Sequence, residues 1–103
     1  MPVKNISTED FIAMATTFKG LGDGTRLRIL AALFEGEACV SDLEAVTGIS
    51  QSAVSHQLRL LRNLKFVSAK RVGQQVFYRI DDDHIGDLFE RALEHARHMD
   101  HRS

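Results

Sequence analysis

The sequence has few residues that form disulfides or interrupt helices and strands, and no apolar run long enough to span a membrane. Its 103 residues include one cysteine, one proline and no tryptophan. The single cysteine, Cys39, excludes an internal disulfide framework. The longest apolar run, residues 29–34, is far too short to cross a bilayer, and no basic segment followed by an apolar stretch predicts a secretory signal. These absences favour a cytoplasmic protein with no membrane partner.

Negative charge is also missing from part of the chain. Residues 51–80 contain no aspartate or glutamate, yet they hold six of the 13 basic residues. The formal net charge is −1, so the remainder of the chain is acidic on balance. Such segregation favours a local patch that faces a polyanion such as nucleic acid; the alternative is a chance cluster on a solvated surface.

The length predicts one domain over residues 1–103, whose modest core would gain buried area by dimerisation. Ser7 or Thr8, followed by two acids, predicts the start of a first helix. Its apolar side chains recur at helical spacing and are Phe11, Met14, Ala15 and Phe18. Asp23 is expected to cap a second helix that closes near Gly36.

A pair of short helices is expected next. The Ser-Asp-Leu-Glu sequence at residues 41–44 fits a capping box. It predicts a short helix that begins after Ser41, buries Leu43 and Val46, and ends at Gly48. Only three residues separate this helix from the next one, and two short helices at a tight glycine turn are typical of a helix-turn-helix.

The second helix of the pair is expected over residues 51–63, with Ser50 as its cap. Val54, Leu58 and Leu61 form a buried stripe, and the opposite face is polar and free of acids. Such a helix enters the major groove of DNA with its first turns against the base edges. The expected base contacts are Gln51, Ser52, Ser55 and His56, and the expected phosphate contacts are Arg59 and Arg62.

Residues 66–70 and 75–80 predict two strands joined by a turn at residues 71–74. A basic hairpin after a recognition helix is a wing, and it is expected to grip the DNA backbone or reach a minor groove. Its expected contact residues are Lys70, Arg71, Gln74 and Gln75. The alternatives for both elements are a solvated surface and a winged-helix module for protein–protein contact.

The acids at residues 81–83 predict the start of a last helix. Its apolar stripe is the most regular in the chain and contains Ile85, Leu88, Phe89, Ala92, Leu93 and Ala96. The expected fold class is therefore mainly α with a β-hairpin, a winged helix-turn-helix in the order α-α-α-α-β-β-α.

Four of the five histidines lie on or beyond this last helix: His84, His95, His98 and His101. Imidazole and carboxylate groups are the ligands that zinc and its neighbours prefer. His84 and His95 share one face but are separated by about 16 Å of helical rise. His98 can share an ion with His95, and Asp82 lies beside His84 at the other end.

An antiparallel second copy of the helix would bring the Asp82 and His84 end of one chain to the His95 and His98 end of its partner. Two-fold symmetry then creates two identical sites in a homodimer, with the apolar stripe between them as packing surface. The alternative is that the acids only cap the helix and the histidines stabilise its C-terminal dipole.

These residues together give a family resemblance. The matching segments are residues 21–30, 39–43, 50–61 and 72–78, with the D-x-H and H-x-x-H pattern of the last helix. The Val-Ser-His-Gln-Leu sequence at residues 54–58 is the most specific of them. Over nearly its full length the chain resembles the ArsR/SmtB family of metal-responsive repressors.

The resemblance implies a non-enzymatic repressor that binds operator DNA as a metal-free homodimer and is released by metal. In zinc- and cobalt-sensing relatives the last-helix pattern forms the dimer-bridging sensor site, which implies Zn(II) as effector with Co(II) or Ni(II) as alternatives; His101 is a possible extra ligand for nickel. The implied ligands are Asp82, His84, His95 and His98. Four protein ligands leave no open position for a catalytic water, which argues against a zinc hydrolase.

A second site of the family uses several cysteines. Cys39 and Asp42 match half of it, but Ser41 stands where some relatives carry a cysteine, and residues 1–19 have neither Cys nor His. We expect no thiolate site for arsenic, lead or cadmium, because soft metals need several sulfurs. Cys39 is expected to be a small buried residue. The same fold sensing another ligand or a redox signal is the remaining alternative.

Overall fold

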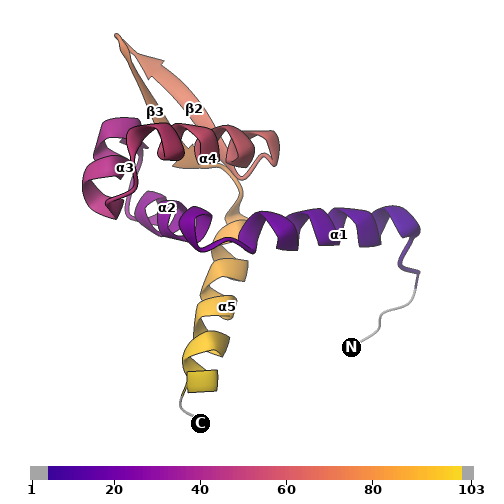
Figure 1. Ribbon diagram of the computed structural model, residues 1–103. Coiled ribbons are helices and arrows are strands. Elements are labelled where there is room, and N and C mark those ends of the chain that lie inside the picture. Colours follow the sequence, from indigo (N-terminus) through magenta and orange to yellow (C-terminus); the bar gives the residue numbers. More distant parts are fainter. Residues whose placement is uncertain (1–4, 101–103) are drawn as a thin grey trace.

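The computed structural model describes residues 5–100 of the chain. In this part the elements are α1 (Thr8–Leu21), α2 (Gly24–Phe34), β1 (Ala38–Cys39), α3 (Val40–Thr47), α4 (Gln51–Asn63), β2 (Val67–Val72), β3 (Gln75–Ile80) and α5 (Asp83–Asp100). The order agrees with the predicted winged helix-turn-helix except for the additional strand β1 (Figure 1). His101, named above as an extra nickel ligand, lies outside the described residues.

Capping side chains set the start of three helices where the sequence predicts them. Ser7 Oγ accepts a hydrogen bond from the Asp10 N–H at 3.0 Å, and Asp10 Oδ2 accepts one from the Ser7 N–H at 3.0 Å. Asp23 caps α2 through the Arg26 N–H at 3.0 Å, and Ser50 caps α4 through the Ala53 N–H at 3.3 Å. Each bond satisfies a backbone donor that has no partner inside its helix.

The predicted start of α3 is wrong. The N-cap is Cys39 rather than Ser41, because β1 delivers the chain directly to the first helical residue, Val40. The Asp42 carboxylate accepts a hydrogen bond from the Cys39 N–H at 3.3 Å. The burial of Val46 was also wrongly predicted, since its side chain is 74% exposed.

The three strands form one antiparallel sheet in the order β1-β3-β2. β2 begins one residue later than predicted and runs two residues further, to Val72, because a two-residue turn at Gly73 and Gln74 connects it to β3. Gly73 has a φ of 64°, a conformation that glycine adopts at no steric cost in such turns. Phe66, predicted as the first strand residue, instead packs into the core.

The hydrophobic core lies between α2, α3, α4, the base of the hairpin and the first turn of α5. Its buried members are Ile29, Leu30, Leu33, Leu43, Val54, Leu58, Leu61, Phe66, Val67 and Ile85. The predicted buried stripe of α4 is thereby confirmed, since all three of its residues are fully buried. Cys39 is 7% exposed, as expected for a small buried residue.

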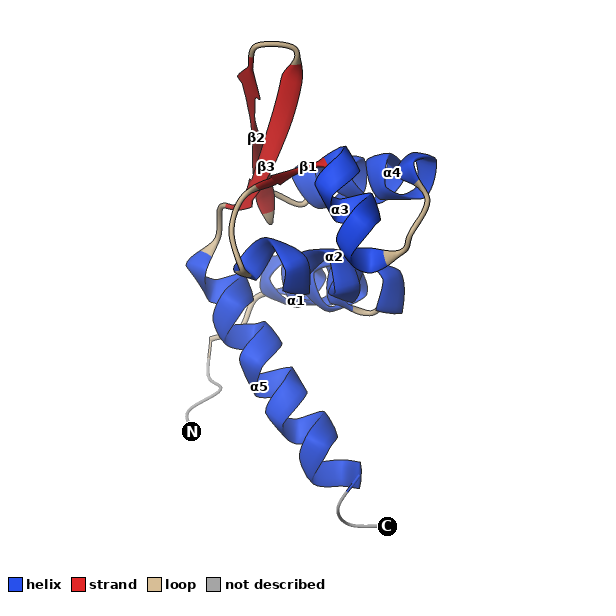
Figure 2. Ribbon diagram, turned by 90° about the vertical axis from the view of Figure 1, so that its left-hand side faces the viewer, coloured by secondary structure: helices blue, strands red, loops and turns tan. Residues whose placement is uncertain are grey.

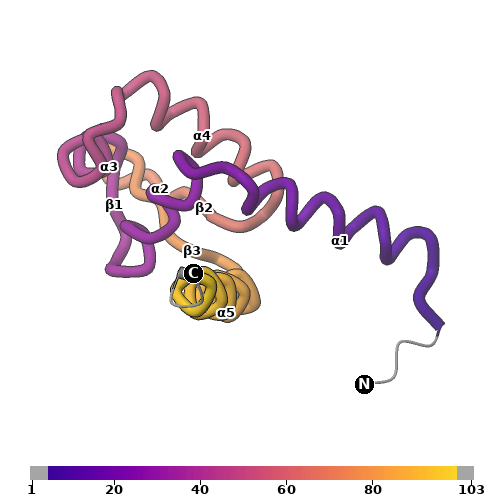
Figure 3. The backbone as a smooth tube through the Cα atoms, turned by 60° about the horizontal axis from the view of Figure 1, so that its bottom comes forward, coloured from indigo at the N-terminus to yellow at the C-terminus, as the bar shows by residue number. Residues whose placement is uncertain are grey.

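Two helices project from this body. Figure 1 shows α1 and most of α5 extending away from it in different directions, and Figure 3, which looks nearly along α5, shows the same separation. Gly20 is the only buried residue of α1. A methyl group there would lie 2.5 Å from Leu64 Cδ1 and 3.0 Å from Phe66 Cε2, so α1 approaches the body most closely at Gly20. Among residues 5–100, no helix is long and apolar enough to cross a membrane.

Candidate functional site

The outer face of α4 presents a row of polar side chains to solvent. Gln51, Ser52 and His56 are exposed in its first turns, Ser55 is half-buried, and Arg59 and Arg62 are exposed further along. The buried stripe on the opposite side holds the helix against the core, so this face points outward. The helix has no acid in its first turn and contains no Asp or Glu. The predicted DNA-contact residues of this helix therefore share one accessible surface without negative charge.

The turn between α3 and α4 is held by polar contacts that the sequence did not suggest. Thr47 Oγ1 donates to the Leu43 carbonyl and accepts from the Ile49 N–H at 3.2 Å, so this buried hydroxyl has a partner both as donor and as acceptor. Arg28 donates to the Thr47 carbonyl at 2.7 Å. Gly48 closes α3 with a φ of 74°, which favours glycine. These contacts fix the position at which α4 begins.

The wing places its predicted residues at the far end of the hairpin. Lys70, Arg71, Gln74 and Gln75 are all exposed, and Arg71 Nε donates to the Gly73 carbonyl at 3.3 Å. Figure 2 shows the hairpin and α4 toward the same end of the molecule, with the C-terminal part of α5 at the opposite end. The hairpin and the recognition helix are therefore both available to one extended ligand.

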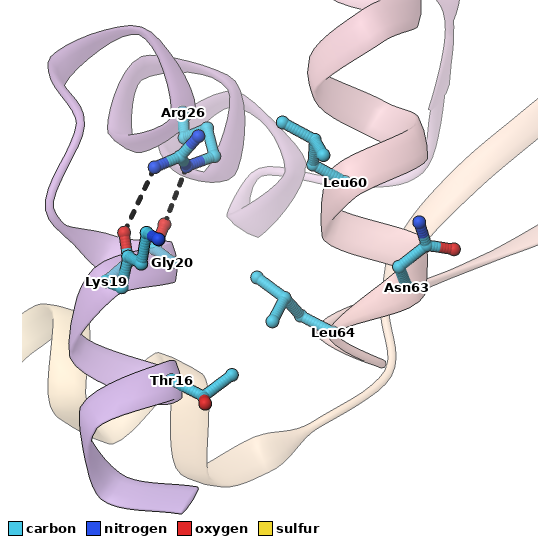
Figure 4. A pocket seen from close by; sticks show the side chains of 7 residues that line it. All are labelled: Thr16, Lys19, Gly20, Arg26, Leu60, Asn63 and Leu64. Carbon is cyan, nitrogen blue, oxygen red and sulfur yellow. Dashed lines mark hydrogen bonds between the residues drawn. The ribbon is translucent and has the colours of Figure 1, made fainter. Parts of the chain in front are cut away.

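Arg26 connects the end of α1 to α4. Its guanidinium donates to the Gly20 carbonyl at 2.9 Å and to the Lys19 carbonyl at 3.0 Å, as Figure 4 shows. A third, longer bond of 3.3 Å reaches Gln57 Oε1 on α4. One side chain of α2 thus joins the projecting helix to the helix that carries the predicted DNA contacts.

The candidate metal ligands form two separate pairs on one chain. Asp82 Oδ1 accepts a hydrogen bond from the His84 N–H at 2.9 Å and lies 3.2 Å from His84 Nδ1. The side chain of His84 is 93% exposed and that of Asp82 is 35% exposed. His95 and His98 are exposed one turn apart, near the other end of α5. The donors are imidazoles and a carboxylate, which is a set that fits zinc.

No three potential ligands converge within the part of one chain that the structure describes. The reason is the length of α5, whose rise of about 1.5 Å per residue keeps the two pairs roughly 16 Å apart. A four-ligand site built from both pairs therefore requires a second chain.

Apolar side chains lie exposed on both projecting helices. On α1, Phe11, Ile12 and Phe18 are 57%, 63% and 58% exposed. On α5, Leu93 and Met99 are 39% and 53% exposed. The helical spacing on α1 was visible in the sequence, but nothing in the spacing distinguished a core face from a surface that awaits a partner.

An apolar hollow between α2 and α5 adds to this exposed surface. It is lined by Leu27, Arg28, Ala31, Phe89, Ala92, Leu93 and Ala96. Phe89 is held in place by an edge-to-face contact with Phe34, with ring centroids 4.9 Å apart. The predicted stripe of α5 thus buries its first turn against the core and leaves its later turns uncovered.

Comparison with known proteins identifies relatives over most of the chain. The model of the arsR family of bacterial regulatory proteins matches residues 23–69. A transcriptional repressor SmtB homolog from Synechocystis is 44% identical over 84% of this chain, which spans 66% of that protein. A cadmium resistance transcriptional regulatory protein, a CadC homolog from Staphylococcus aureus, is 37% identical over 93% of this chain and 80% of its own length.

A solved structure agrees with the fold as well. The homodimeric winged helix-turn-helix DNA-binding domain Mb0332 from Mycobacterium bovis, a possible ArsR-family regulator, superposes with a TM-score of 0.81 at 28% identity. The match covers 94% of this chain and 90% of that one.

Proposed function

The chain belongs to the arsR family of bacterial regulatory proteins, and we propose that it is a metal-responsive transcriptional repressor that binds operator DNA as a homodimer. Metal, with Zn(II) as the proposed effector and Co(II) or Ni(II) as alternatives, releases it from that DNA. The proposed place of action is the cytoplasm, and residues 1–103 act as one DNA-binding and dimerisation domain. Its relatives are transcriptional regulators rather than enzymes.

The observation that carries the proposal is the accessible, acid-free face of α4. A helix of this kind fits the major groove, where hydroxyl, amide and imidazole groups read base edges. Gln51, Ser52, Ser55 and His56 are the proposed base contacts. The proposed phosphate contacts are Arg59 and Arg62 on the helix and Lys70, Arg71, Gln74 and Gln75 on the wing. The SmtB homolog is itself a transcriptional repressor.

Support for the homodimer comes from the uncovered apolar surface of α1 and α5. Exposed apolar surface marks interaction sites, and here the exposed apolar side chains lie on two helices that project from the body. The related Mb0332 domain is homodimeric. A second copy of this chain would bury Phe11, Ile12 and Phe18 of α1 together with the hollow beside Leu93.

Support for the metal site comes from the two half-sites of α5. Asp82 and His84 of one chain, with His95 and His98 of its partner, would make four ligands of the types that zinc binds tetrahedrally. A bound ion would link the two α5 helices across the dimer axis. Cadmium, for which the CadC homolog is named, is a less suitable effector here, because Cys39 is the only thiol and lies buried.

Release from DNA follows by linkage. If the metal fits one dimer geometry better than the geometry that DNA requires, each ligand weakens the binding of the other by the same factor. Two recognition helices must be spaced by about one turn of DNA, roughly 34–36 Å, and a change at the dimer axis alters that spacing.

The test is an operator-binding titration. Purified protein is titrated onto a duplex from upstream of its own gene, with and without Zn(II), Co(II) or Ni(II), and fluorescence anisotropy reports binding. We expect tight binding without metal and weak binding with one ion per chain. His84→Ala and His95→Ala should still bind the duplex tightly without metal, but metal should no longer weaken that binding. Asp87→Ala is the matched control on α5. Metal-insensitive binding by the unmodified protein would remove the sensing proposal and leave a DNA-binding fold.

A further inference from the structure

A polar hollow of about 220 Å³ lies between the outer face of α4 and the wing. It is lined by Ser55, Arg59, Arg62, Asn63 and Tyr78. Ser55, Arg59 and Arg62 follow one another at spacings of four and three residues, so they share one stripe of the helix. Tyr78 comes from β3, the central strand of the sheet. Two elements distant in sequence thus enclose one site, of which Asn63 and Tyr78 were not among the predicted DNA contacts.

The strand register places only small side chains directly opposite Tyr78, which leaves space for its ring. Its partners across the sheet are Ala38 on β1 and Ala69 on β2. Directly opposite residues share a face, so two methyl groups flank the ring on that face. The ring is half-buried and packs against the core, but its hydroxyl bonds to no described residue. Every buried side-chain nitrogen or oxygen in the described part of the chain has a partner, so this hydroxyl reaches solvent.

The charged groups of the hollow are also unpaired. Within residues 5–100, neither Arg59 nor Arg62 forms an ion pair or a side-chain hydrogen bond. The Asn63 amide has no partner there either. Asn63 also borders the hollow beside Arg26, and Figure 4 shows its amide directed away from Arg26. Two guanidinium groups, an amide and a phenol therefore surround one polar hollow with their donors unused.

We infer that this hollow binds one phosphate of the DNA backbone, with Tyr78 and Asn63 donating hydrogen bonds beside Arg59 and Arg62. The inference rests on the DNA binding proposed above and deepens it. A guanidinium fork matches the oxygens of a phosphate, and tyrosine and asparagine donate to phosphate oxygens in protein–DNA complexes.

Free phosphate has the same chemistry, but the position of the hollow favours DNA. It opens on the face of α4 that carries Ser52 and His56, beginning about one turn from the start of the helix. A backbone contact at this point would fix how far α4 enters the groove.

The experiment measures binding of metal-free protein by fluorescence anisotropy to two duplexes, one from upstream of its own gene and one unrelated, over a series of salt concentrations. Tyr78→Phe removes only the hydroxyl. It should weaken binding of both duplexes by about three- to tenfold and leave the salt dependence unchanged, because no charge is lost. Asn63→Ala should behave alike. The double variant Arg59→Ala/Arg62→Ala should reduce the magnitude of the slope of log affinity against log salt by about 0.9, the value for one neutralised phosphate, and each single variant should reduce it by less.

Arg79→Ala is the matched control. Arg79 is the next residue of β3, so it lies on the other face of the sheet. Its guanidinium is held by Ser68 Oγ at 3.2 Å and lies 4.0 Å from Asp81. Loss of the Arg79 charge should change the salt slope by less than half as much as loss of Arg59 and Arg62 together. Thermal unfolding of each variant, followed by circular dichroism, checks that the fold is retained, and Asn63 and Arg62 are exposed enough to be replaced without unfolding.

Three results would overturn the inference. If Tyr78→Phe and Asn63→Ala bind both duplexes like the unmodified protein, the phosphate contact is wrong and the proposed function stands. If the unmodified protein binds neither duplex, both are overturned. Phosphate ion can also be tested by replacing chloride with it at equal ionic strength. If Tyr78→Phe weakens the binding of phosphate ion but leaves DNA affinity unchanged, the hollow is a site for free phosphate and the inference is again overturned.

Discussion

Replacing Arg26 by alanine is expected to loosen the junction where α1, α2 and α4 meet. The substitution removes all three donors that join the carbonyls at the end of α1 to Gln57 on the recognition helix. Among residues 5–100, no other side-chain hydrogen bond or ion pair joins these three elements to one another. The effect on stability follows from the surroundings of each bond.

The three bonds do not contribute equally. Hydrogen bonds to a charged group contribute about 1.5–3 kcal/mol each when the acceptor stays dry. The bond to the Gly20 carbonyl is short and partly buried, so its loss leaves an acceptor that water reaches poorly. The Lys19 carbonyl is exposed and water replaces the guanidinium there, and the bond to Gln57 is long at 3.3 Å. We expect Arg26→Ala to lower the free energy of unfolding by about 2–3 kcal/mol.

Urea unfolding followed by circular dichroism measures this loss, at a fixed protomer concentration because the stability of a dimer depends on it. Arg26→Lys should lose roughly half as much free energy of unfolding, since a single ammonium can bond to one of the two α1 carbonyls but not to both. Lys70→Ala, an exposed position on the wing, is the control and should stay within about 0.5 kcal/mol of the unmodified protein. Equal stabilities of Arg26→Ala and Lys70→Ala would refute the reasoning.

Three other substitutions test separate parts of the structure. Leu58→Ala empties a fully buried position and should lower the free energy of unfolding by about 2–5 kcal/mol; Val46→Ala, at a 74% exposed position, should barely change it, and similar losses would contradict the assigned core. Gly48→Ala places a side chain at a φ of 74° and should cost about 1–2 kcal/mol in urea unfolding; Gly24→Ala, with open space around it, should not, and the reverse order would contradict the turn geometry. His84→Ala should reduce zinc bound per dimer, measured by calorimetry, without changing metal-free DNA affinity; unchanged zinc binding would exclude this ligand.

Much of the fold was predictable where local chemistry agrees with the tertiary structure. Ser7, Asp23 and Ser50 cap their helices as predicted, because each side chain reaches a backbone donor within three residues. The stripe of α4 was predictable because one face of a helix must be buried when the other is polar.

The errors arise where tertiary contacts decide. β1 has two residues, too few to show periodicity, and it exists because β3 pairs with it. Its presence moves the start of α3 from Ser41 back to Cys39. On α3, Leu43 and Thr47 face the core because they lie four residues apart on one stripe of the helix. Val46 lies outside that stripe, although its side chain is more apolar than that of Thr47.

The candidate site divides in the same way. Spacing along α5 was enough to predict two ligand pairs, because helix geometry is fixed. The hollow at Tyr78 was not predictable, since it depends on the β-sheet register and on the packing of α4 beside the sheet. The six basic residues and the absence of acids over residues 51–80 indicated a basic surface in this part of the chain, but not the hollow within it.

The close approach at Gly20 has a consequence for how this protein can diverge. A methyl group at this position would meet Leu64 Cδ1 at 2.5 Å, so the Leu64 side chain would have to move to admit it. Homologous chains that carry alanine in this place are therefore expected to carry a shorter residue than leucine opposite it, so that the two positions change together. A large set of related sequences would then show paired substitutions at positions 20 and 64, which link α1 to the residue that caps the end of α4.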